Sequence, residues 1–63
     1  MAESLENDRL VLARAVREAC VAAARQGYAD ALMSGLCAEG AQEATLSAIE
    51  SLDLAEVLKG LKE

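Results

Sequence analysis

Residues 10–25 read LVLARAVREACVAAAR, and this stretch decides the fold class. It is dominated by Ala, Leu, Arg and Glu, the strong helix formers. Apolar residues recur at helical spacing, at Leu12, Val16, Ala19 and Ala23, and Leu5 extends the same stripe toward the N-terminus. Charged residues lie roughly opposite this stripe: Arg14, Arg17, Glu18 and Arg25. The stretch therefore predicts an amphipathic helix.

The rest of the chain supports an all-α fold in a single domain, residues 1–63. The sequence contains no proline, and Tyr28 is its only aromatic residue. Its few β-branched residues are scattered, so no alternating run of strand length appears. A chain of 63 residues without large aromatic side chains buries little apolar area by itself. We therefore expect a compact bundle of three to four short helices, completed by self-association, most simply as a homodimer.

Glycines leave the helix boundaries open to two interpretations. Ser4 is a plausible N-cap for the first helix. Gly27 either ends that helix or lies within it at a cost of about 1 kcal/mol relative to alanine. A break near Gly27 is the favoured interpretation. The alternative is a continuous helix to about Ser34, which gives a long helical hairpin with a short C-terminal helix. The two glycines of residues 34–40 predict a turn in either case.

Two more helices are expected after this turn. Residues 41–52 form an amphipathic pattern with the inner face Ala41, Ala44, Thr45, Ala48, Ile49 and Leu52. Residues 53–56, DLAE, match a capping box in which Asp53 caps the next helix and Glu56 bonds back to the Asp53 amide. Leu52 and Val57 complete a hydrophobic staple around this cap. The last helix therefore starts at Asp53, with Leu54, Val57, Leu58 and Leu61 as its apolar face.

The net charge of −5 is unevenly distributed. Residues 9–25 carry four arginines and one glutamate, a net charge of +3, whereas residues 26–58 carry six acids and no base, a net charge of −6. These segments are complementary, so they can attract each other within one chain or between the chains of an antiparallel dimer. A net negative chain is a poor ligand for phosphates, which makes a nucleic-acid partner unlikely. No stretch is long and apolar enough for a membrane span or a signal peptide, so no membrane partner and a cytoplasmic location are expected.

The residues that usually carry chemistry are sparse. The chain has no histidine, so its cysteines and serines lack their usual catalytic base. Cys20 and Cys37 match no metal-binding spacing, and we interpret them as buried reduced thiols. A helix N-terminus near Cys37 would lower the pKa of that thiol. We expect no metal and no cofactor, and an enzymatic activity is not the favoured interpretation.

The leading hypothesis is a small protein-interaction module that acts as a regulator, adaptor or accessory subunit of a larger assembly. Its predicted interaction surface consists of Leu10, Val11, Arg14, Arg17, Val21 and Arg25. The Ala-rich face around Ala19, Ala23 and Ala24 is the predicted close-packing surface between two copies. The alternative is a small-molecule-binding protein or minor enzyme with a pocket between helices or subunits, formed by Tyr28, Leu32 and Cys37.

Overall fold

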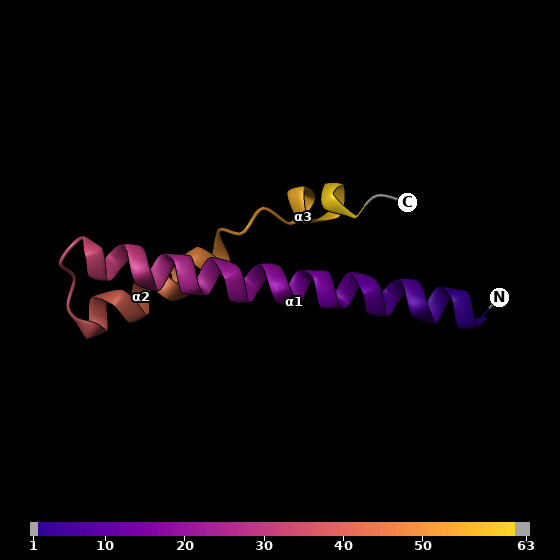
Figure 1. The fold of residues 1–63 in the computed structure, drawn as a ribbon, viewed down its shortest axis with the longest axis horizontal. Helices are drawn as coiled ribbons and strands as arrows, with labels where there is room; N and C mark the ends of the chain where they lie inside the picture. Colours follow the sequence, from indigo (N-terminus) through magenta and orange to yellow (C-terminus); the bar gives the residue numbers. More distant parts are fainter. Residues whose placement is uncertain (1, 62–63) are drawn as a thin grey trace.

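The computed structural model describes the backbone of residues 2–61 and the side chains of residues 5–61, and within this range all regular structure is helical. The helices are α1 (Ala2–Met33), α2 (Ala38–Glu50) and α3 (Leu54–Gly60), shown in Figure 1. The predicted all-α class is confirmed. Helix α1 starts two residues before Ser4, so the start predicted there is slightly late, and the side chain of Ser4 lies outside the described side chains.

Helix α1 runs through Gly27 without interruption, so the break that we favoured at this residue is wrong. Gly27 faces α2 at very close range. A Cβ atom built on Gly27 would lie 2.7 Å from the Ala48 Cβ atom and 3.2 Å from the Ala44 carbonyl oxygen. Glycine therefore stands here because the two helix backbones approach each other closely, and the sequence alone does not distinguish this role from a helix stop.

The real end of α1 is a Schellman motif with Gly35 at the C′ position. The Gly35 amide donates to the Leu32 carbonyl at 3.0 Å, and the Leu36 amide donates to the Ala31 carbonyl at 3.0 Å. Gly35 has a φ of 91°, a conformation that side chains with a Cβ atom rarely adopt. This motif reverses the chain within the predicted turn and directs α2 back along α1.

Helix α2 begins three residues before the predicted start at Ala41 and ends two residues before Leu52, so Gly40 belongs to the helix and not to the turn. The predicted inner face is confirmed, since Ala41 is fully buried and the other five residues of that face are half-buried. Thr45 belongs to this face, and its hydroxyl donates to the Ala41 carbonyl at 2.8 Å, which satisfies its polar group.

Asp53 caps α3 as predicted. Its carboxylate accepts hydrogen bonds from the Ala55 amide at 3.0 Å and the Glu56 amide at 3.3 Å. The expected return bond from Glu56 is not found among the described residues, and the Glu56 carboxylate lies 3.6 Å from the Lys59 Nζ atom. Of the predicted apolar face of α3, Val57 and Leu61 are half-buried, whereas Leu54 and Leu58 are exposed.

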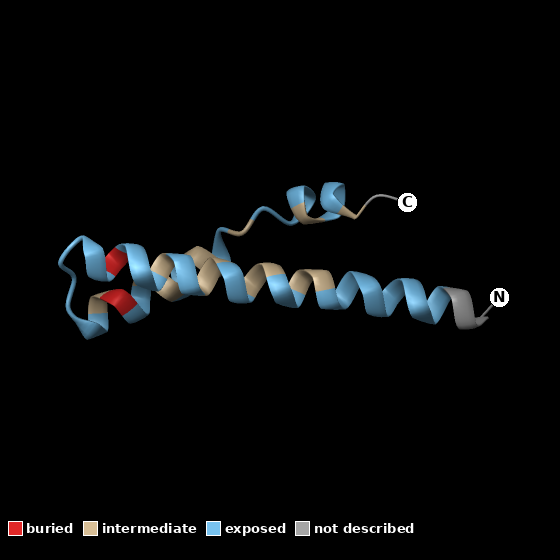
Figure 2. Ribbon diagram, in the orientation of Figure 1, coloured by how far each residue is buried: buried red, intermediate tan, exposed pale blue. Residues whose placement is uncertain are grey.

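The assembled chain is more extended than the compact bundle that we expected. Its principal extents are 51 × 17 × 14 Å. Helix α1 has 32 residues and spans about 48 Å, whereas the 13 residues of α2 span only about 20 Å. Helix α2 therefore covers only the C-terminal part of α1, and α3 lies beside its middle (Figure 1). Residues 5–14 of α1 are exposed on all sides (Figure 2).

Candidate interaction surface

The chain buries very little of itself. Among residues 5–61, only Ala31 and Ala41 are buried, with exposed fractions of 6% and 0%. Ala31 lies near the end of α1 and Ala41 near the start of α2, and Figure 2 shows the buried segments, in red, at this end of the molecule. No large side chain in this range is fully buried. The contact between α1 and α2 is therefore a narrow alanine-lined seam and not a core of large side chains.

Large apolar side chains remain on the outside instead. They are found on all three helices and in the turn, and half or more of the side chain is often accessible to solvent. In the described part of the chain they are Leu5, Leu10, Val11, Leu12, Val21, Tyr28, Leu32, Met33, Leu36, Leu46, Leu54 and Leu58. Scattered apolar residues are normal on protein surfaces, but here a large set of them stands beside an almost absent core.

The solvent-accessible area shows how much more surface the chain exposes than a compact protein of the same mass. The chain exposes 5180 Å². A compact monomer of 6.6 kDa would expose about 3,900 Å². The excess is thus about 1,300 Å², which is larger than the roughly 800 Å² that each partner contributes to a standard protein–protein interface.

One continuous stripe of exposed residues follows α1 on the side away from α2. We call it the outer face of α1. On a helical wheel its members fall within an arc of about 100°, roughly opposite Gly27 and Ala31. It consists of Val11, Arg14, Glu18, Val21, Arg25, Tyr28 and Leu32, all exposed. The structure thereby joins most of the predicted interaction surface to two of the three predicted pocket residues.

The remaining predicted residues lie elsewhere. Leu10 and Arg17 flank the outer face along one edge and are exposed. Ala19, Ala23 and Ala24 are half-buried within the chain, so the face predicted to pack against a second copy is already partly covered by the chain's own helices. Glu18 was placed on the charged side of the first helix but was not among the predicted surface residues.

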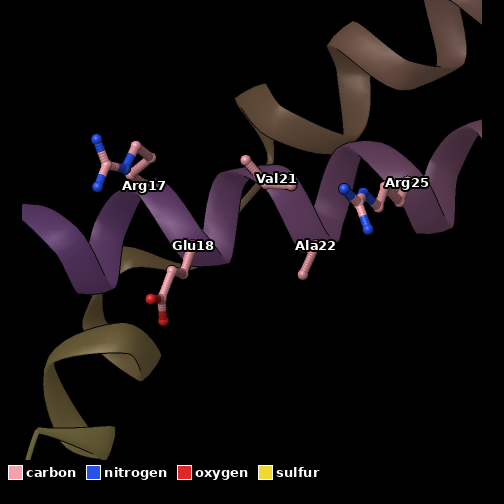
Figure 3. A pocket seen from close by; sticks show the side chains of 5 residues that line it. All are labelled: Arg17, Glu18, Val21, Ala22 and Arg25. Atoms are coloured by element: carbon pink, nitrogen blue, oxygen red, sulfur yellow. The ribbon is translucent and has the colours of Figure 1, made fainter.

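A shallow hollow lies at the centre of the outer face. It is lined by Arg17, Glu18, Val21, Ala22 and Arg25 (Figure 3). All five residues belong to α1, and one straight helix is convex, so its side chains cannot enclose a cavity. The small Ala22 side chain lies between longer ones and leaves a shallow depression.

Charged groups of this face have no ion-pair partner among the described residues. The ion pair found in the described residues joins Glu56 to Lys59 within α3, away from this face. The basic segment of α1 and the acidic α2 therefore form no ion pair in the described structure, although their charges are complementary. Glu18 and Arg25 lie two turns apart, about 10 Å along the helix axis, which is too far for contact within one helix.

The two cysteines are free thiols in different environments. Cys20 is half-buried, whereas Cys37 is exposed at the N-cap of α2, so the predicted burial is wrong for Cys37. The backbone amides of Gly40 and Glu39 at the start of α2 lower the pKa of the Cys37 thiol, as expected for a thiol at a helix N-terminus. Cys37 lies beyond the end of α1, whereas Tyr28 and Leu32 belong to that helix.

Neither a metal-binding cluster nor a membrane-spanning helix is found in the described residues. Their carboxylates and thiols form no group of three or more that could bind a metal ion. None of the helices there combines the length and the apolar character needed to cross a membrane. No protein-family model matches this chain, and neither the curated proteins nor the solved structures contain a significant match.

Proposed function

We propose that this chain is a small protein-interaction module that acts as a regulator, adaptor or accessory subunit, and that other helices complete its fold. The observation that carries this proposal is the imbalance between exposed and buried apolar surface. Twelve large apolar side chains are exposed in the described residues, whereas only two alanines are buried. Such a surface is energetically unfavourable in water and is stabilised when another protein covers it.

A second copy of the chain is the first partner that we propose. The excess exposed area of about 1,300 Å² per chain corresponds to an interface of about 2,600 Å² in a dimer, within the range of obligate homodimers. A second copy is the simplest partner because it is always present at the same concentration as the chain itself. In this proposal, dimerisation and folding are coupled, because a chain with so small a core is marginally stable alone.

A further apolar surface remains for a larger protein partner. Leu54 and Leu58 are one turn apart on α3 and more than half exposed. Leu5, at 57% exposed, lies on the uncovered N-terminal part of α1. A protein partner that binds these residues would make the dimer a subunit of a larger assembly.

The free thiols Cys20 and Cys37 suit a reducing compartment, so we propose a cytoplasmic location.

The test is a dilution series in reducing buffer, with mass measured by light scattering and stability by urea denaturation. We expect a dimer or larger oligomer whose unfolding midpoint rises with protein concentration. An apolar fluorescent dye should bind the dissociated chain at low concentration. A monomer at all concentrations that unfolds cooperatively and binds no dye would refute the proposed function.

A further inference from the structure

We propose that the outer face of α1 binds the same face of a second copy in antiparallel orientation, around a two-fold axis beside Val21 and Ala22. This inference rests on the proposed function and adds the orientation, the register and the residues of one interface. It follows from the spacing, the charges and the shape of the exposed face.

The spacing of the outer face is that of a helix–helix interface. Its seven residues are separated alternately by three and four positions from Val11 to Leu32. This alternation is the heptad pattern that keeps a row of side chains facing a partner helix. The row covers 22 residues, or about 32 Å along the helix axis. The chain's own helices cover the opposite side, so this row is free to meet another helix.

The row is also nearly symmetric about its centre. When two copies of α1 run antiparallel and cross beside Val21 and Ala22, residues whose numbers add up to 42 or 43 meet across the axis. Val21 then meets Val21 of the second copy, and Val11 meets Leu32 of the second copy. Arg14 lies over the ring of Tyr28 of the second copy, a favourable cation–π arrangement. The centre and both ends of the interface are therefore apolar.

Charge selects this orientation over a parallel one. In the antiparallel register Glu18 meets Arg25 of the second copy, and the two-fold axis repeats this ion pair. In a parallel, in-register pair each residue would meet its own copy, so glutamate would face glutamate at position 18 and arginine would face arginine at positions 14 and 25. Like charges across an interface are unfavourable, and complementary charges fix orientation and register.

The hollow marks the crossing point. It lies around Val21 and Ala22, between Glu18 on one side and Arg25 on the other (Figure 3). The small Ala22 side chain lets two helices approach closely at their centre, where Val21 of the second copy lies. The excess exposed area of the chain exceeds what a standard interface requires from each partner.

Charge reversal tests the register directly. The Glu18→Arg variant places two positive charges opposite each other at the contact with Arg25 of the second copy. The Arg25→Glu variant places two negative charges opposite each other at the contact with Glu18. Because the symmetry repeats each pair, either single variant converts two attractive pairs into two repulsive ones. We expect each to raise the dimer dissociation constant by at least about tenfold. The double variant E18R/R25E restores both attractive pairs and should dimerise about as tightly as the unmodified chain.

Mixing the two single variants provides the sharper test. In a heterodimer of Glu18→Arg with Arg25→Glu, one contact joins two unlike substituted residues and the other joins Arg25 to Glu18. Both contacts are attractive, so the mixture should form heterodimers although each variant alone dissociates. A chain that simply failed to fold would not be rescued in this way. Matched reversals away from the face, Glu43→Arg on α2 and Arg9→Glu on the opposite side of α1, should leave dimerisation unchanged.

Thiol cross-linking reads out the orientation. In a Cys20→Ser/Cys37→Ser background, a Val11→Cys chain mixed with a Leu32→Cys chain should form a mixed disulfide, and neither chain alone should form one efficiently. An oligomer that ignores all charge reversals and gives no mixed disulfide overturns this inference while leaving the proposed function intact. A monomer that still binds apolar dye also overturns it. A dye-free, cooperatively folded monomer overturns the inference and the proposed function together.

Discussion

Replacing Gly27 by alanine should destabilise the chain, although alanine is the better helix former. The intrinsic preference of alanine over glycine within a helix favours the variant by about 1 kcal/mol. The new methyl group, however, would lie 2.7 Å from the Ala48 Cβ atom and 3.2 Å from the Ala44 carbonyl oxygen. Carbon atoms pack best at about 3.5–4.0 Å, so α1 and α2 must separate by roughly 1 Å.

Overpacking of this kind costs about 1–3 kcal/mol. The two effects together predict a net loss of about 0–2 kcal/mol of unfolding free energy for Gly27→Ala. The matched control is Gly60→Ala in α3, where a new Cβ atom meets nothing within 4 Å. That variant should be neutral or gain up to about 1 kcal/mol. The opposite responses of two helical glycines isolate the contribution of the seam.

Urea denaturation followed by far-ultraviolet circular dichroism measures both variants, at one fixed protein concentration because dimerisation contributes to stability. A double-mutant cycle with Ala48→Gly removes the closest clash, and we expect a coupling of about 1 kcal/mol between the two positions. If Gly27→Ala stabilises as much as Gly60→Ala and shows no coupling to Ala48→Gly, the close packing of α1 against α2 is refuted.

Three further variants or reactions test other parts of the structure. Gly35→Ala should lose about 1 kcal/mol of unfolding free energy because φ is 91° there, and a denaturation curve unchanged from that of the parent chain would contradict the Schellman turn. Asp53→Ala should cost α3 about 1 kcal/mol and accelerate amide hydrogen exchange in that helix, whereas Asp53→Ser should retain most of the cap; equal exchange in both variants would argue against capping. Alkylation of Cys37 should be faster than that of Cys20. The alkylation rate of Cys37 should rise at a lower pH than in the urea-unfolded chain, because the amides at the start of α2 lower the pKa of this thiol and increase its thiolate fraction. A dependence of the rate on pH that unfolding leaves unchanged would rule out that cause.

Local signals in the sequence predicted local structure well. The inner face of α2 was recognised because six apolar or small residues follow one helical stripe, and the Asp53 cap because its acceptor and the amides it binds are two and three residues apart. Both features depend on short-range geometry. The start of α2 was placed too late because Gly40 is compatible with a turn as well as with a helix. In the structure Gly40 is helical, and a Cβ atom built on it would lie 3.1 Å from the Leu36 side chain.

The role of Gly27 depended on information from another part of the chain. Whether a glycine ends a helix or permits close packing is decided by what lies opposite, here Ala44 and Ala48, about 20 residues further along. The same uncertainty at Gly27 divided the residues of the outer face between two separate predictions, an interaction surface and a pocket. With the favoured break at Gly27, Val21 and the predicted pocket residues Tyr28 and Leu32 would belong to different helices. Once α1 is continuous, one helical phase places all three on a single face.

The alanine seam also explains why binding and stability should be linked in this chain. Alanine and glycine allow two helices to approach closely, but each alanine removes only a small apolar area from water, so the seam contributes little hydrophobic stabilisation. The larger side chains, such as Val21 and Leu32, remain accessible and contribute only when a partner covers them. A substitution on the outer face that weakens the proposed dimer should therefore also lower the urea midpoint, and the loss should shrink under conditions where both chains are fully dissociated. A face used only by a transient partner would leave the midpoint of the isolated chain unchanged.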